Sequence, residues 1–116
     1  MSETFTTPVV IWSGCYDDGW KGLIHPEAFS HPAKMSRGLV VRIFDELFAM
    51  GALKKDDTIC DPFAGIGSTG IEAASRFCHF IGVELEPKFV ALAKENFELH
   101  RRDWADTGRP QPQVVQ

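Results

Sequence analysis

Three glycines in the run DPFAGIGSTG, residues 61–70, have the spacing that most clearly predicts a function. Gly65, Gly67 and Gly70 form the pattern GxGxxG directly after a short apolar run. Between a strand and a helix, such glycines let the backbone approach a large, electron-rich ligand. An acid, Glu84, lies nineteen residues beyond Gly65, where it could accept ribose hydroxyls. The pattern therefore favours an adenosine-containing ligand, although a tight turn without a ligand has the same pattern.

The residues around the glycines separate three classes of ligand. A phosphate-binding P-loop needs a lysine after its last glycine, and no lysine lies between Lys55 and Lys88. A dinucleotide loop follows its strand almost directly, whereas residues 61–63 are inserted before Gly65. The aspartate of this insertion suits a cationic ammonium group better than a diphosphate. We therefore expect S-adenosylmethionine, and the dinucleotide-binding domain of an oxidoreductase is the alternative.

The three motifs together resemble the DNA amino-methyltransferase family, whose members methylate adenine N6 or cytosine N4. DPFAGIGSTG is similar to the family's cofactor motif DPFxGxGTT, and IGVELEP, residues 81–87, to the motif that follows it. FSHPAKMSRGL, residues 29–39, resembles the motif HPxxKPxxL, with HPAKM in place of HPxxKP. The wider run GWKGLIHPEAFSHPAKMSRGL looks like the start of phage and bacterial members. The resemblance covers about residues 29–100.

The resemblance implies a cofactor site with a role for several residues. Glu84 would bind the ribose, and the HPAK segment would close over the methionine end of the cofactor. Lys34 and the helix start at Ser36 could bind its carboxylate, or Lys34 is a solvated loop lysine. Phe63 could line the pocket or belong to the core. The expected cofactor-binding residues are Phe29, Ser30, His31, Lys34, Asp61, Pro62, Phe63, Gly65, Gly67, Ser68, Thr69, Glu84 and Leu85.

One family motif is missing from the sequence. The catalytic tetrapeptide Asp/Asn/Ser-Pro-Pro-Tyr/Phe/Trp does not occur, and there is no Pro-Pro dipeptide. In the family this motif engages the target amine while its aromatic residue stacks on the flipped base. We expect this chain to be the S-adenosylmethionine-binding part of a DNA N-methyltransferase and to be incomplete and inactive alone. DNA would be the substrate of the complete enzyme. The alternatives are a non-catalytic module that binds S-adenosylmethionine, or one subunit of a split enzyme whose second chain supplies the motif. The expected partner is that second chain or, in a homo-oligomer, another copy of this chain.

The apolar periodicity predicts the elements that would position these residues. Helices are expected over 36–51, 68–77 and 87–100, strands over 58–60 and 79–85, and further short strands could form at 9–12 and 114–115. Ser36 and either Ser68 or Thr69 are the expected N-caps. This order predicts an α/β class, a partial Rossmann-like methyltransferase fold with a short parallel sheet flanked by helices. Residues 1–28 would be an irregular extension with aromatic anchors, 29–105 the cofactor-binding half, and 106–116 a tail.

Composition narrows the class of protein further. With 116 residues there is room for one domain, and a net charge of -4 argues against a free-standing nucleic-acid binder. Cys15, Cys60 and Cys78 have no metal-binding spacing and are expected to be buried or half-buried free thiols. His25 and His31 are expected to be ordinary loop histidines, without a metal. No signal peptide or membrane-spanning run is found, so we expect a soluble, cytoplasmic protein.

Overall fold

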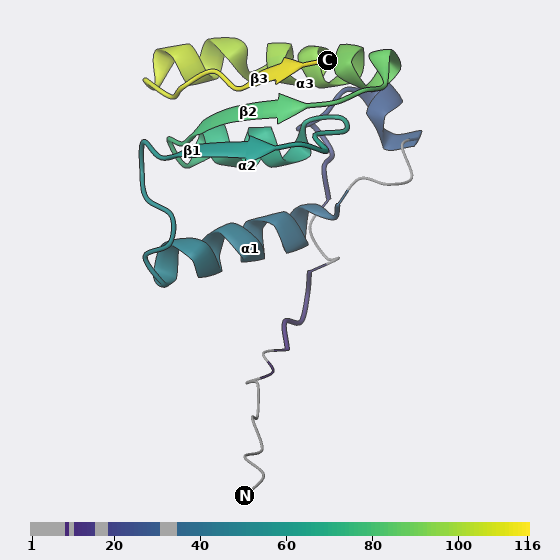
Figure 1. The fold of residues 1–116 in the computed structure, drawn as a ribbon. Helices are drawn as coiled ribbons and strands as arrows, with labels where there is room; N and C mark the ends of the chain where they lie inside the picture. Colours follow the sequence, from purple (N-terminus) through teal and green to yellow (C-terminus); the bar gives the residue numbers. More distant parts are fainter. Residues whose placement is uncertain (1–8, 10, 16–18, 31–34) are drawn as a thin grey trace, which may run out of the picture.

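The chain folds as a parallel sheet with its helices on one face. The computed structural model describes residues 9, 11–15, 19–30 and 35–116. In chain order the elements are the 3-10 helix η1 (Pro26–Ser30), α1 (Arg37–Ala49), β1 (Thr58–Asp61), α2 (Ser68–Ser75), β2 (His79–Val83), α3 (Pro87–Asp106) and β3 (Gln113–Val115). The three strands are parallel in the order β1-β2-β3, as Figure 1 shows. The predicted α/β class and short parallel sheet are confirmed.

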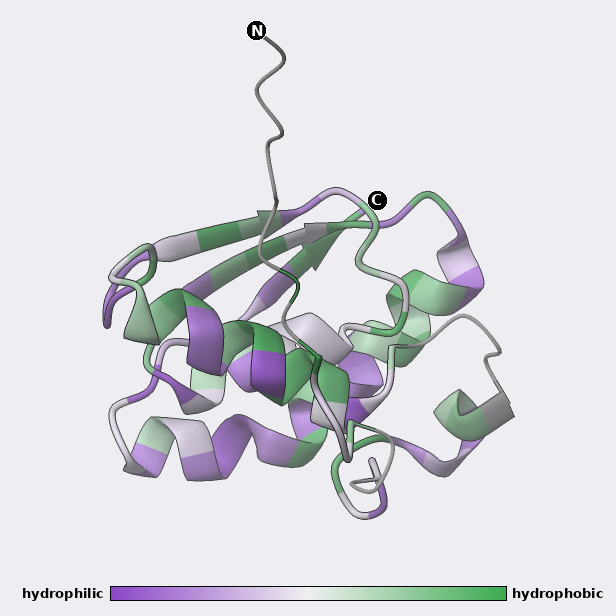
Figure 2. Cartoon of the chain, turned by 90° about the horizontal axis from the view of Figure 1, so that it is seen from below, coloured by the Kyte–Doolittle hydropathy of each residue, from purple (hydrophilic) through white to green (hydrophobic). Residues whose placement is uncertain are grey.

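The two faces of the sheet differ because burial alternates along the strands. In β2, Phe80 and Gly82 are buried, whereas His79 and Ile81 are exposed. The ring of Phe80 packs edge-on against Phe97 of α3, with 6.4 Å between ring centroids. Helices α2 and α3 therefore cover the Phe80 face, and Figure 2 shows the strands as a separate layer on one side of the helices. Among the described residues, no helix covers the opposite face.

The segment before α1 contributes to the core. Trp20, Ile24 and Ala28 are almost completely buried, and the indole Nε1 of Trp20 donates to the carbonyl of Met35 at 2.9 Å. The aromatic anchors predicted from the sequence are Trp12, Tyr16, Trp20 and Phe29. Trp20 is buried as predicted, whereas Phe29 is 45% exposed and Tyr16 lies outside the described residues. Residues 20–28 belong to the packed body of the protein.

The N-termini of α1 and α2 are capped in different ways. The Ser36 hydroxyl accepts from the Leu39 N–H at 3.4 Å, which confirms the predicted cap of α1. The prediction that Ser68 or Thr69 caps α2 is wrong. Gly67 holds that position in a left-handed conformation, φ 84°, and has no side chain to bond the helix N-terminus. Glycine is suited to this backbone geometry because it has no Cβ.

Other boundaries also differ from the prediction. The strand expected over 79–85 ends at Val83, and the strand expected over 58–60 continues to Asp61. Helix α3 continues past residue 100 to Asp106, because the buried ring of Trp104 packs against Phe97 and His100. Helix α2 ends at Ser75, before the predicted residue 77. The described residues 9, 11 and 12 form no strand, whereas the predicted strand at 114–115 is present as β3.

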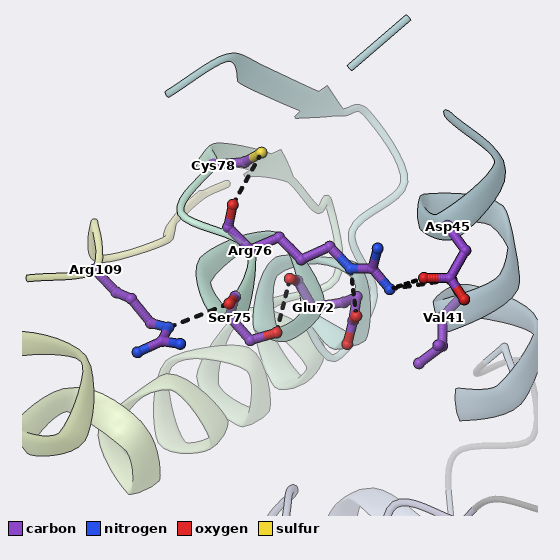
Figure 3. Close-up of polar contacts among 7 residues, drawn as sticks. All are labelled: Val41, Asp45, Glu72, Ser75, Arg76, Cys78 and Arg109. Atoms are coloured by element: carbon purple, nitrogen blue, oxygen red, sulfur yellow. Dashed lines mark hydrogen bonds and ion pairs between the residues drawn. The ribbon is translucent and has the colours of Figure 1, made fainter. Parts of the chain in front are cut away.

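Arg76 fixes α1 against α2, as Figure 3 shows. Its Nη2 lies 2.6 Å from Oδ1 of Asp45 on α1, and its Nε lies 2.8 Å from Oε1 of Glu72 on α2. The guanidinium also lies 5.6 Å from the ring centroids of Phe44 and Phe48. Burial lowers the pKa of Arg76, but the hydrogen bonds and charges of both carboxylates outweigh it, and the pKa is raised. The contact holds α1 beside the sheet, beyond β1.

The cysteines are free thiols in three different environments. Cys78 is buried and Cys15 is half-buried, as predicted. Cys60 is exposed, which corrects the expectation, because β1 directs alternate side chains to the uncovered face of the sheet. Among the described residues, no helix combines the length and the apolar character that crossing a membrane requires.

Candidate functional site

The carboxyl ends of β1 and β2 bring the predicted site residues together. Asp61 ends β1, and Glu84 directly follows β2. Parallel strands place these two ends at the same edge of the sheet. The Ala64 N–H donates to the Val83 carbonyl at 3.0 Å, so the glycine loop lies directly beside the end of β2. Ligands of open α/β sheets bind at this edge.

Glu84 connects the glycine loop to the start of α3. Its Oε1 accepts from the Gly65 N–H at 3.1 Å, and its Oε2 accepts from the Glu86 N–H at 2.8 Å. A carboxylate offers about four lone-pair sites, so two backbone bonds leave acceptor capacity for hydroxyl donors. The Glu84 N–H donates in turn to the Val115 carbonyl at 3.0 Å. The half-buried carboxylate is therefore held in a defined place on the site.

The glycine spacing has two physical causes. At Gly65, φ is 55° and an added Cβ would meet no atom of the described residues within 4 Å, so the position borders open space. At Gly67 an added Cβ would lie 2.7 Å from the Phe97 ring, and at Gly70 it would lie 2.8 Å from the Phe80 ring. The last two glycines thus allow α2 to pack closely on its neighbours. Only the first lies where a ligand could approach the backbone without displacing other residues.

The insertion before the glycines forms a compact turn. Oδ1 of Asp61 accepts from the Phe63 N–H at 2.9 Å, an Asx turn that orients the carboxylate at the strand end. The Phe63 side chain is 86% exposed, so the core alternative for this residue is excluded. Leu85, which follows Glu84 in the chain, is 82% exposed. Pro62 is exposed, and at the start of α2 Ser68 is buried and Thr69 is half-buried; among these turn residues Asp61 provides the charge.

The remaining predicted residues lie on the N-terminal segment. Phe29 and Ser30 end η1, on the side toward which the strands point (Figure 1). His31 and Lys34 lie outside the described residues, so the predicted carboxylate partner has no structural description. The described residues contain no group of three or more histidine, cysteine or acidic side chains that could hold a metal ion.

Sequence reasoning missed Asn96, a polar residue of α3 whose side chain bonds the glycine loop. Asn96 is completely buried, and its Nδ2 donates to the Ile66 carbonyl at 2.8 Å. The sequence feature that could have identified Asn96 is its polar side chain within an apolar stripe, one turn beyond Ala93 and next to Phe97. A buried polar side chain on such a stripe needs a partner, and here the partner is the loop itself.

An α/β sheet whose strand ends carry a glycine loop and an acid is an arrangement that this chain shares with nucleotide-binding proteins. Residues 8–95 match the DNA methylase family of N6 and N4 methyltransferases. The chain therefore belongs to the DNA amino-methyltransferase family, which confirms the resemblance of its motifs.

Individual relatives share only part of their length with this chain. A type II methyltransferase of Moraxella bovis is 37% identical over 67 residues, covering 58% of this chain and 23% of that protein. An uncharacterised RNA methyltransferase of Lactococcus lactis is 32% identical over 59 residues, covering 51% of this chain and 13% of that protein. The chain thus spans less than a quarter of the length of either relative. A crystal structure of a TehB-like SAM-dependent methyltransferase from Corynebacterium glutamicum aligns with a TM-score of 0.41 at 16% identity, covering 69% of this chain and 45% of that one.

Proposed function

We propose that this chain binds S-adenosylmethionine at the carboxyl ends of β1 and β2, as the cofactor-binding part of a DNA amino-methyltransferase. The observation that carries the proposal is the position of Glu84, whose carboxylate is fixed 3.1 Å from the N–H of Gly65. The ribose hydroxyls would donate to its remaining lone pairs, and the backbone at Gly65 leaves room for them. Membership of the family supports the choice of cofactor.

The other predicted residues would bind the rest of the cofactor. Asp61 offers one carboxylate oxygen outside its Asx turn to the ligand's ammonium group. The exposed side chains of Phe63 and Leu85 would supply apolar surface for the adenine. The start of α2, with Ser68 and Thr69, carries no charged side chain that would suit a diphosphate.

The proposed reaction is methyl transfer to the exocyclic amine of adenine or cytosine in DNA. The amine nitrogen would attack the sulfonium methyl in line, the carbon–sulfur bond would break, and the nitrogen would lose a proton. Positioning supplies most of the rate in such a displacement. Because the Pro-Pro-aromatic tetrapeptide does not occur in the sequence, we propose that methyl transfer requires a polypeptide segment that supplies it.

The uncovered face of the sheet supports the need for a further segment. Cys60, Ile81 and Val115 are exposed there, with Ile81 at 41% and Val115 at 48%. In the described part of the chain, β1 pairs only with β2, so the other edge of β1 is unpaired. Parallel sheets are ordinarily covered on both faces. A second polypeptide segment or a second copy of the chain would bury this surface.

Titration calorimetry tests the proposed ligand. We expect the purified chain to bind S-adenosylmethionine and S-adenosylhomocysteine more tightly than NAD, because the Asp61 carboxylate suits an ammonium group and no cationic side chain at the start of α2 would suit a diphosphate. Tighter binding of NAD would contradict the proposal and favour a dinucleotide-binding domain.

A further inference from the structure

We propose that Asn96 and His100 of α3 are positioning residues. Asn96 joins the glycine loop to the segment directly before η1, and His100 holds that segment, so that two parts of the cofactor site keep one arrangement. The inference rests on the proposed function, because the arrangement matters only if a ligand contacts both parts.

The side chain of Asn96 bridges two segments that are far apart in the sequence. Its Nδ2 donates to the Ile66 carbonyl, inside the glycine loop, at 2.8 Å. Its Oδ1 accepts from the His25 N–H, directly before η1, at 2.5 Å. The side chain is 0% exposed, so water cannot replace either partner. One buried amide therefore fixes the loop and the N-terminal segment to the same point of α3.

A second contact on the same helix face holds the N-terminal segment. Nε2 of His100, one turn after Asn96, lies 2.6 Å from the Leu23 carbonyl. The His100 ring stacks on Trp104, with 5.0 Å between centroids, which orients it toward that carbonyl. Nδ1 of His25 also lies 3.8 Å from the Glu95 carboxylate. Helix α3 thus binds residues 23–25 through His100, Asn96 and Glu95.

These contacts place η1 relative to the glycine loop. Ala28, within η1, is 0% exposed, so the turn is packed against the body and carries Phe29 and Ser30 with it. The loop and the segment directly before η1 are both held by α3, and Asn96 contacts both. A ligand whose adenosine part lies on the loop and whose amino-acid part reaches η1 would meet two elements that are already ordered. Preorganisation of this kind increases affinity because less conformational freedom is lost on binding.

The affinities for two ligands distinguish an effect on the arrangement of the site from a general loss of stability. Adenosine would contact the loop and Glu84, whereas S-adenosylhomocysteine also carries the amino-acid part. Calorimetry of the full chain with both ligands gives an affinity ratio for each variant. His100→Ala removes the contact to residue 23 and leaves the Asn96 bridge intact. We expect it to weaken S-adenosylhomocysteine about fivefold and adenosine less than about twofold.

Asn96→Ala removes both ends of the bridge and is expected to weaken both ligands, by roughly tenfold. Arg101→Ala is the matched control, because Arg101 is a neighbouring exposed residue of α3 and, among the described residues, its guanidinium pairs with Glu98 on the helix surface. His100→Gln can still donate to the Leu23 carbonyl and should restore the wild-type ratio. If Asn96→Ala does not fold, His100→Ala and its rescue decide the question.

An unchanged affinity ratio in His100→Ala, with the wild type binding both ligands, would overturn the inference and leave the proposed function intact. An equal loss of both ligands in that variant would also overturn it, because the contact would then be merely stabilising. If the wild-type chain binds neither ligand, the proposed function fails first and the inference fails with it.

Discussion

Oε1 of Glu84 lies 3.1 Å from the N–H of Gly65, so the acid expected to bind a ribose also holds the loop that would admit it. Its other oxygen accepts from the Glu86 N–H at the start of α3. Ligand binding and local order therefore depend on one carboxylate. The two properties should change together when that carboxylate is removed.

Replacement of Glu84 tests this dual role. Glu84→Ala is expected to weaken S-adenosylmethionine binding at least about tenfold, because charge-assisted hydrogen bonds to the ribose contribute about 1.5–3 kcal/mol. The melting temperature should also fall, since Gly65 and Glu86 lose their acceptor. Glu86→Ala is the control, because its backbone N–H remains. An unchanged affinity and melting temperature in Glu84→Ala would make this residue an ordinary surface acid.

The glycine at the start of α2 is expected to be required for packing. Gly67→Ala would place a Cβ 2.7 Å from the Phe97 ring, in addition to the strain of its positive φ. Gly51→Ala has a similar φ, 73°, and an added Cβ there meets no atom of the described residues within 4 Å. We expect Gly67→Ala to lower the free energy of unfolding by about 1–3 kcal/mol more than Gly51→Ala. Equal losses in urea titrations of the two variants would contradict the packing argument.

The two ion pairs of Arg76 are expected to contribute strongly to stability. Arg76→Ala leaves the Glu72 side chain, 11% exposed, without its cationic partner. We expect the free energy of unfolding to fall by about 2–4 kcal/mol, measured by chemical denaturation. Arg101→Ala breaks a pair whose side chains are 69% and 68% exposed and should change stability little. Similar effects of both variants would show that the Arg76 contacts are no stronger than a surface pair.

The buried thiol of Cys78 predicts a loss of stability in alkaline solution. Burial raises the pKa of Cys78, and the charges of nearby aspartates contribute in the same direction. The unfolded chain therefore releases this proton at a lower pH than the folded chain. The free energy of unfolding should fall as the pH rises beyond about 8.5, the ordinary pKa of a thiol. Denaturation at several pH values should show a smaller alkaline decrease in Cys78→Ala, and an identical decrease would exclude this thiol as its source.

Methyl transfer is expected to depend on a polypeptide that supplies the missing tetrapeptide. The purified chain should transfer no tritiated methyl groups to unmodified DNA, and light scattering should detect self-association through the uncovered sheet face. Addition of a segment with a Pro-Pro-aromatic motif should restore transfer if it completes the site. Robust transfer by the chain alone would show that the tetrapeptide is dispensable. A monomer at high concentration would show that the uncovered face is stable in water.

Local chemistry explains which elements the sequence predicted well. Ser36 caps α1 through its own hydroxyl, and Pro87 begins α3 where its missing N–H is not needed. The motif at residues 61–70 also lies where the pattern places it, between a strand and a helix. These features depend on neighbours a few residues away, which a single sequence displays directly.

Tertiary contacts account for what the sequence did not predict. The cap of α2 is Gly67 because α3 packs so closely that a side chain would collide with Phe97. The bridge of Asn96 joins residues separated by 30 and 71 positions in the chain. Helix α3 extends to Asp106 because Trp104 finds a buried site. None of these partners can be paired from periodicity or propensity alone.

The position of Cys60 makes the sheet surface addressable by chemical labelling. Cys60 is aligned with Ile81 in the neighbouring strand, so its thiol lies on the uncovered face. Cys15 is half-buried and Cys78 is buried, so a maleimide should modify Cys60 first. A fluorophore attached there would sense a change of solvent when another polypeptide covers β1 and β2. The rate of modification alone would then measure how tightly that polypeptide binds, without any assay of catalysis.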